Sequence, residues 1–167
     1  MTEKQPIRSK EDLLAHAIAI EREAATRYRE LGERMGDLGN DAVAELFLHL
    51  AGMEKTHQLE LERRAAGMAL PPIGAGEYAW FDDGAPETAA HDLVLKLLTP
   101  HSALMIALAA EERAAEFFET IGRQSRDPAL AGLAAEMATE ESVHAAWVQS
   151  ALRRTPDSVI DWNAVFG

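Results

Sequence analysis

The sequence predicts an all-α fold, an antiparallel four-helix bundle with one long crossover between the second and third helices. Three observations lead to this class. Apolar residues make up 47% of the chain, with alanine and leucine prominent and few β-branched runs, a composition that favours helices. Four long segments carry helix-start signals, and the second pair of segments repeats the pattern of the first pair. Two helical hairpins joined by a long connection give a bundle whose second and third helices run parallel.

Capping residues locate the first two helices. Ser9 to Asp12 resembles a capping box with aspartate in the acidic place, and it opens the first helix. Asn40 or Asp41 is a suitable N-cap for the second helix. Gly67 suits a position just after that helix, where the chain often takes a left-handed backbone.

The third and fourth helices begin with a shared signal. Thr99-Pro100 and Asp127-Pro128 each combine an N-cap residue with proline at the first helical position. The expected helices cover residues 9–37, 41–66, 99–125 and 127–154, with a crossover at 67–98 and a tail at 155–167. Within the crossover, residues 87–98 have the pattern of a short additional helix. The chain is most simply one domain over residues 1–167.

The bulk composition argues against several classes of function. A formal net charge of -12 disfavours nucleic-acid binding, which needs a basic face. The absence of cysteine rules out disulfides, zinc–thiolate sites and iron–sulfur clusters within the chain. The polar start shows no signal peptide, and the longest apolar run is too short to span a bilayer. We therefore expect a soluble cytoplasmic protein without a membrane partner.

The most informative motif is Glu-x-x-His, which occurs at Glu54–His57 and again at Glu141–His144. Each copy is preceded by a glutamate in a similar alanine-rich setting, Glu21 in the first half and Glu111 in the second. Residues three apart on a helix lie about 60° apart around its axis, so each motif can direct both ligands at one ion. All four glutamates lie in the apolar stripes of their helices. Buried carboxylates must be protonated, hydrogen-bonded or metal-bound, and the joint pattern predicts a metal centre.

The ligand types indicate which metal the centre holds. Four carboxylates and two imidazoles without sulfur suit two iron ions, with manganese or zinc as substitutes, although zinc prefers fewer ligands. Glu54 and Glu141 are the predicted bridges because each lies beside a histidine ligand, which leaves Glu21 and Glu111 as terminal ligands. Alanines near the ligands either leave space for dioxygen or peroxide or serve close helix packing; they are at positions 24, 25, 114, 115 and 145.

These six residues resemble the rubrerythrin-like branch of the ferritin superfamily, and the resemblance covers both helical hairpins. It includes the small and aromatic residues that follow each single glutamate, Ala24 and Tyr28 in the first half and Ala114 and Phe118 in the second. The family implies a non-haem di-iron site that reacts with dioxygen or hydrogen peroxide. Its members serve in peroxide removal, ferrous-iron oxidation and iron handling.

Three features depart from the related families. Rubrerythrins carry a rubredoxin domain with an iron tetrathiolate, whereas this chain has no cysteine, so an electron donor would be another protein. Ala114 stands where rubrerythrins have an extra glutamate on the third helix, and the ligand exchange attributed to such sites is therefore not expected. Lys55 stands where bacterioferritins have a haem-ligating methionine.

Several functional alternatives remain open from the sequence. Tyr28 is expected to face the site, where its hydroxyl either bonds a ligand carboxylate or, as a core aromatic, bonds water. The whole protein is either a peroxidase- or ferroxidase-type oxidoreductase, an iron-storage protein, or a structural bundle that keeps an inactive metal site. The expected partners are peroxide or dioxygen, an external electron-donor protein, and further copies of the chain in a homodimer or larger homo-oligomer.

Overall fold

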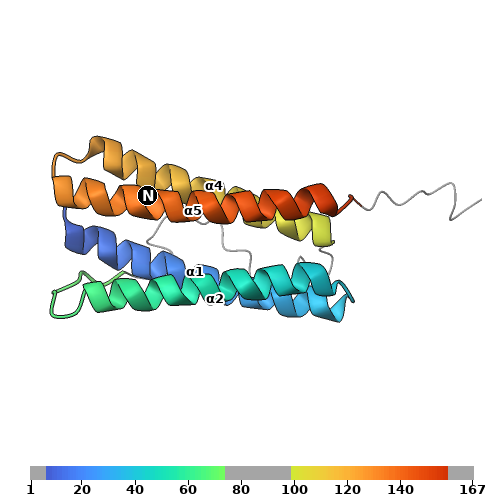
Figure 1. The fold of residues 1–167 in the computed structure, drawn as a ribbon. Coiled ribbons are helices and arrows are strands. Elements are labelled where there is room, and N and C mark those ends of the chain that lie inside the picture. Colours follow the sequence, from blue (N-terminus) through green and yellow to red (C-terminus); the bar gives the residue numbers. More distant parts are fainter. Residues whose placement is uncertain (1–6, 74–98, 158–167) are drawn as a thin grey trace, which may run out of the picture.

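The computed structural model describes residues 7–73 and 99–157, and within these ranges the chain forms a four-helix bundle (Figure 1). The helices are α1 (Lys10–Asp37), α2 (Asp41–Arg64), α4 (Pro100–Gln124) and α5 (Pro128–Arg154). Helix α1 runs antiparallel to α2, and α4 runs antiparallel to α5. Helices α2 and α4 run in the same direction, as a long crossover requires (Figure 1). The predicted fold class is confirmed.

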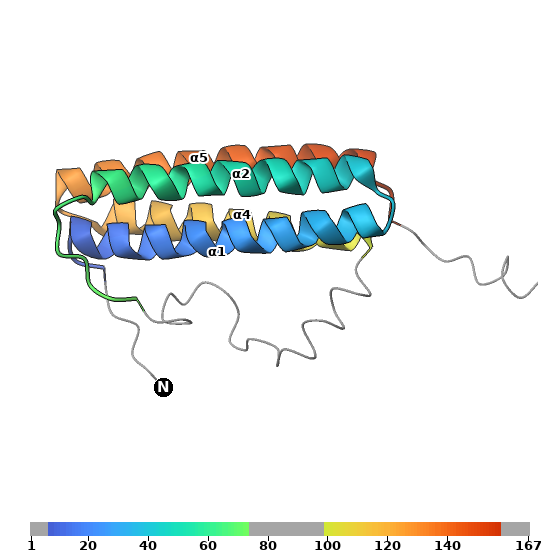
Figure 2. The same cartoon turned by 90° about the horizontal axis from the view of Figure 1, so that it is seen from below.

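The bundle consists of two packed hairpins, α1 with α2 and α4 with α5. In the orthogonal view, α2 and α5 lie on one side of the bundle, and α1 and α4 lie on the other (Figure 2). The two helices that carry Glu-x-x-His are therefore neighbours. The two helices that carry a single ligand glutamate are neighbours as well.

The predicted caps set the starts of the first two helices. Ser9 Oγ accepts the backbone N–H of Asp12 at 3.0 Å, and the Asp12 carboxylate accepts the backbone N–H of Ser9 at 3.1 Å. This reciprocal pair confirms the capping box. At α2 the cap is Asn40 and not Asp41, because Asn40 Oδ1 accepts the N–H of Val43 at 3.0 Å.

Proline opens both helices of the second hairpin, as predicted. Helix α2 ends at Arg64, slightly before the predicted residue 66, and Gly67 follows with a left-handed φ of 81°. Glycine takes this backbone without the steric cost that a side chain would add. The predicted helix at 87–98 and residues 158–167 of the predicted tail lie outside the described residues.

The apolar core is divided into two clusters along the bundle axis. One cluster contains Leu13 and Phe118 and joins the beginnings of α1 and α5 to the ends of α2 and α4. The other contains Phe47 and Leu104 and joins the opposite ends of the same helices. Burying each large apolar side chain contributes roughly 1.5–3 kcal/mol, so both ends of the bundle are held firmly. The space between the clusters holds buried polar residues.

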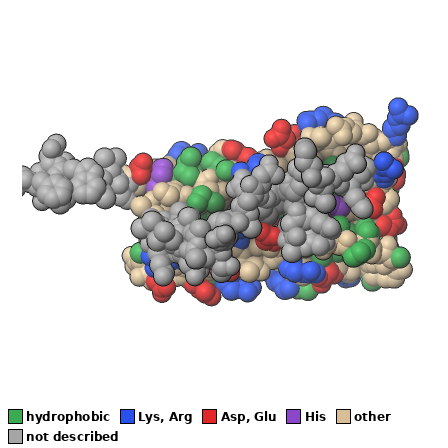
Figure 3. All heavy atoms as spheres, turned by 180° about the vertical axis from the view of Figure 1, so that it is seen from behind, with side chains coloured by type: hydrophobic (Ala, Val, Ile, Leu, Met, Phe, Trp, Pro, Cys, Tyr) green, Lys and Arg blue, Asp and Glu red, His purple; other side chains and the backbone are tan. Residues whose placement is uncertain are grey.

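The outer surface is charged with both signs. Acidic and basic side chains are interspersed around the face shown in Figure 3, with hydrophobic groups between them. Ion pairs between such exposed side chains contribute little stability individually. Among the described residues, no helix has the length and apolar character needed to cross a membrane.

Candidate metal centre

The six predicted ligands meet between the two apolar clusters. Five of them are 1–3% exposed, and the sixth, His57, has a side chain that is 13% exposed. Each of the four described helices contributes: the candidate ligands are Glu21 from α1, Glu54 and His57 from α2, Glu111 from α4, and Glu141 and His144 from α5. The motif spacing therefore brings both histidines and all four carboxylates into one buried region.

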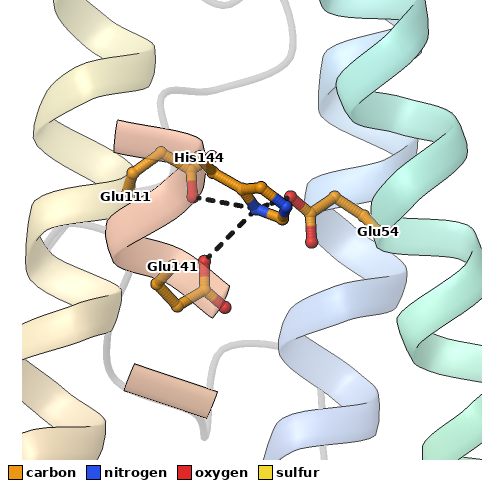
Figure 4. A group of neighbouring side chains, drawn as sticks. All are labelled: Glu54, Glu111, Glu141 and His144. Carbon is orange, nitrogen blue, oxygen red and sulfur yellow. Dashed lines mark ion pairs between the residues drawn. The ribbon is translucent and has the colours of Figure 1, made fainter. Parts of the chain in front are cut away.

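One group of ligands surrounds the His144 ring (Figure 4). Its Nδ1 atom lies 2.8 Å from Glu54 Oε1, 3.6 Å from Glu111 Oε2 and 3.8 Å from Glu141 Oε2. These residues come from α2, α4 and α5, so the group links the two hairpins. One donor atom from each of the four residues lies within 4.8 Å of the others.

The second group surrounds His57. Its Nδ1 atom lies 3.9 Å from Glu21 Oε2 and 4.0 Å from Glu54 Oε2. Glu54 thus belongs to both groups, whereas Glu141 belongs to the His144 group. The two imidazole rings stack with centroids 5.4 Å apart and planes 10° apart. The groups are therefore adjacent halves of one centre.

The unsatisfied atoms of this centre fit metal ligation. Among the described residues, both oxygens of Glu21 and the Nδ1 atom of His57 are buried without a hydrogen-bond partner. The buried Nδ1 atom of His144 and Oε1 atom of Glu54 contact each other at 2.8 Å. Orphaned polar atoms in a protein interior are costly, and coordination to a cation removes that cost. Metal–ligand bonds of about 2.1 Å place two donors of one ion at most about 4.2 Å apart, which matches the contacts of His57.

Comparison with known proteins confirms the family that the sequence resembles. The Rubrerythrin family model matches residues 12–75 and 102–162. The chain belongs to the rubrerythrin family. A crystal structure of an uncharacterised conserved protein from Magnetospirillum magnetotacticum MS-1 resembles it with a TM-score of 0.79 and 32% sequence identity, covering 91% of this chain and 99% of that one. No curated protein matches the sequence significantly.

The electrostatics of this rubrerythrin-family centre favour a bound cation. Burial and the neighbouring carboxylates, Glu54 above all, raise the pKa of Glu21 and of Glu141 well above the usual value. Burial alone would raise the pKa of Glu54 too, but Glu21 and the histidines lower it. Burial alone would lower the pKa of His144, yet Glu111 and Glu54 raise it to about 10. Without a metal, protons must neutralise this concentration of negative charge.

Tyr28 touches the centre directly. Its hydroxyl donates a hydrogen bond to Glu111 Oε1, and its ring stacks on Phe47 at a centroid distance of 5.9 Å. Tyr28 is 3% exposed, so this hydrogen bond is shielded from water. The sequence left open whether the Tyr28 hydroxyl bonds a ligand carboxylate or water, and in the structure it bonds the carboxylate of Glu111, a predicted ligand. Such a bond orients the carboxylate toward the site.

A small cavity of about 20 Å³ reaches the carboxylates from the side of α1 and α4. A cavity of this size holds about one water molecule. Its polar lining includes Glu54, Glu111 and Glu141, and its apolar lining includes Ala24, Ala107, Ala110 and Ile106. Of the five alanines predicted near the ligands, Ala24 lines this cavity, those at 25 and 114 pack in the core, and those at 115 and 145 line a separate groove between α4 and α5.

Two residues near the centre were not predicted as part of it. Glu140 Oε2 lies 3.9 Å from His57 Nδ1, across the contact between α5 and α2. Trp147 lies with its ring 5.5 Å from the ring of His144. The spacing of three residues between His144 and Trp147 indicates a shared helix face, a signal that could have been used. Glu140 lies four residues before His144, which also indicates a shared helix face, but its approach to His57 depends on how α5 packs against α2.

Proposed function

We propose that this rubrerythrin-family protein is a di-metal oxidoreductase that holds two iron ions and reduces hydrogen peroxide or dioxygen. The observation that carries the proposal is the pair of buried ligand groups that share Glu54. Oxygen and imidazole donors without sulfur suit iron or manganese. Two such ions would neutralise the crowded carboxylates, among them Glu21, whose two buried oxygens have no hydrogen-bond partner among the described residues.

The size of the cavity supports the proposal of a very small substrate. Its volume of about 20 Å³ and its alanine walls match peroxide or dioxygen better than an organic molecule. When bound, a ferrous pair supplies two electrons together, so that hydrogen peroxide and two protons give two water molecules without release of hydroxyl radical. The apolar clusters on both sides exclude bulk water from the reacting region.

The protein's own side chains then have distinct tasks. The glutamates and histidines bind the ions, and Glu54 contributes to both ligand groups. Tyr28 donates its hydroxyl hydrogen bond to Glu111 Oε1 and so fixes the orientation of that carboxylate. Because the sequence has no cysteine for an iron tetrathiolate, we also propose an external electron-donor protein. A homodimer in the cytoplasm is the setting we propose for this reaction.

A stopped-flow experiment tests the proposed reaction. Protein purified and loaded with ferrous iron under anaerobic conditions is mixed with hydrogen peroxide, and the oxidation of iron is followed by absorbance. We expect oxidation in a single cycle that repeats only when a reductant is added, with little hydroxyl radical detected by a spin trap. The control is the double variant His57→Ala/His144→Ala. Oxidation at the same rate in both proteins would contradict the oxidoreductase function.

Molecular size separates the enzyme from the storage alternative. A storage protein needs a closed shell of many subunits around its mineral, whereas an enzyme of this family can act as a dimer. We expect size-exclusion chromatography with light scattering to give a dimer mass. A shell-sized particle that accumulates many irons per chain would favour storage.

A further inference from the structure

Glu140 lies at the outer edge of the metal centre, on α5. Its side chain is 37% exposed, and its Oε2 atom lies 3.9 Å from His57 Nδ1. The His57 side chain is 13% exposed, and the Glu21 and Glu54 side chains beyond it are 1% exposed. Exposure therefore decreases stepwise from Glu140 through His57 to the buried carboxylates.

Two carboxylates near Glu140, those of Glu60 and Glu136, are both held by one arginine. Arg64 Nη2 lies 2.8 Å from Glu60 and 2.5 Å from Glu136. In contrast, the contact that Glu140 makes among the described residues is with His57, and Arg64 acts on it only from a longer distance. A carboxylate with no arginine or lysine in direct contact can still receive a cation from solvent.

Glu21 independently points to a cation at the inner side of His57. It is 1% exposed, and neither of its carboxylate oxygens has a hydrogen-bond partner among the described residues. Its Oε2 atom lies 3.9 Å from the same His57 nitrogen that faces Glu140. The imidazole thus stands between a half-exposed carboxylate and an orphaned buried one.

We infer that Glu140 is the metal-loading residue of this protein: it binds a divalent cation at the surface and transfers it past His57 to Glu21 and Glu54. The inference rests on the proposed di-metal function and adds the route by which the site is filled. A half-exposed carboxylate exchanges a cation rapidly because water still reaches it. The buried ligands hold the ion more tightly because they meet it with several donors away from competing water. Local negative charge at the mouth of a site also raises the association rate.

Cobalt(II) binding kinetics test the inference without depending on catalysis. Cobalt(II) binds nitrogen and oxygen donors and gives a visible spectrum when bound. Metal-free protein is mixed with cobalt(II) chloride in a stopped-flow instrument, and the final stoichiometry is measured by elemental analysis. We expect Glu140→Gln to load about tenfold more slowly than the natural chain but to reach the same two ions. Glu140→Asp, which keeps the charge, should load at an intermediate rate.

Glu119→Gln is the matched control for net charge. Glu119 is a 52% exposed glutamate on α4, and it pairs with Arg123 at 3.3 Å. We expect this variant to load at the natural rate in buffer with 0.15 M salt, where the Debye length is about 8 Å.

The possible results separate the loading route from the metal centre itself. Equal loading by Glu140→Gln and the natural chain, with two ions in each, would overturn the inference and leave the di-metal function intact. A final stoichiometry below two in Glu140→Gln would make Glu140 a permanent ligand, which also overturns it. Equal slowing in Glu119→Gln would assign the effect to general charge. Failure of the natural chain to bind a metal pair would remove the proposed function together with the inference.

Discussion

At the scale of single residues, Glu54 is the residue that the two halves of the candidate metal centre share. It belongs to the His57 group and to the His144 group, whereas Glu21 belongs only to the first. We expect Glu54→Ala to abolish binding of the metal pair and Glu21→Ala to leave about one ion per chain, because a bridge contacts both ions. The sequence assigns a bridging role to Glu141 as well, so Glu141→Ala should behave like Glu54→Ala. Elemental analysis of anaerobically loaded protein gives the stoichiometries. Equal loss in all three variants would contradict the bridging assignment.

Tyr28 supports a second prediction at the residue scale. Replacing Tyr28 with phenylalanine keeps the ring that stacks on Phe47 but removes the hydrogen bond to Glu111. We expect the metal-free protein to lose about 1.5–3 kcal/mol of unfolding free energy, the usual worth of a buried bond to a charged group. Metal affinity should fall about 10–100-fold, because the carboxylate is no longer oriented. Calorimetric titration measures the affinity, and unchanged binding would limit Tyr28 to a packing role.

The clustering of the six candidate ligands could be predicted because a helix fixes the geometry of Glu-x-x-His. The apolar stripes on each helix then indicated that Glu21 and Glu111 point inward, and both are buried in the structure. Glu140 could not be predicted in the same way. Its proximity to His57 depends on the distance between α2 and α5, which no spacing along either helix specifies. The sequence left open whether the alanines beside the ligands create space or serve close packing, and the structure has both, because small residues fill gaps as readily as they create them.

At the scale of the helices, local capping signals were sufficient to locate the boundaries. The capping box at Ser9 and the proline starts of α4 and α5 all form as the sequence indicates. The end of α2 was the least well predicted boundary, because the last turn of a helix frays and Gly67 acts only after that turn. The order of the hairpins followed from the repeat, since a long crossover requires α2 and α4 to run parallel.

The cap of α1 gives a prediction at this scale. Ser9→Ala removes the side-chain acceptor for the Asp12 N–H, which should cost about 1 kcal/mol of unfolding free energy. Metal stoichiometry should remain that of the natural chain, because Glu21 lies well inside the helix. Ser9→Asp is the matched variant, and it should keep most of the stability because aspartate is an equally good N-cap. Chemical denaturation measures both effects. A loss of metal binding in Ser9→Ala would show that the end of α1 and the centre are linked.

At the scale of the whole molecule, folding of the metal-free bundle is coupled to the binding of protons at the buried centre. The pKa values of Glu21 and Glu141 are raised by burial and neighbouring carboxylates, and the pKa of His144 is raised from 6.5 to about 10 by Glu111 and Glu54 against the effect of burial. The folded metal-free protein therefore binds more protons than the unfolded chain above pH 6.5. The lowered pKa of Glu54 acts in the opposite direction, but its stabilising effect is already complete above the usual value of 4.5 and is lost only in acid.

Proton linkage then predicts how the stability of the metal-free protein depends on pH. The stabilisation from charged His144 is complete below pH 6.5 and is lost as the pH rises through about 10, so the melting temperature should fall over this interval. Each kcal/mol lost lowers it by about 2–4 °C in a chain of this size. The metal-loaded protein should show a flatter profile, because ions take the place of the protons and bind more tightly as the ligands deprotonate.

Calorimetry with and without a chelator measures both profiles, and His144→Ala should show a smaller slope when metal-free. A melting temperature that rises with pH in the chelated natural protein would contradict the proton-filled centre and weaken the case for cations as its natural occupants.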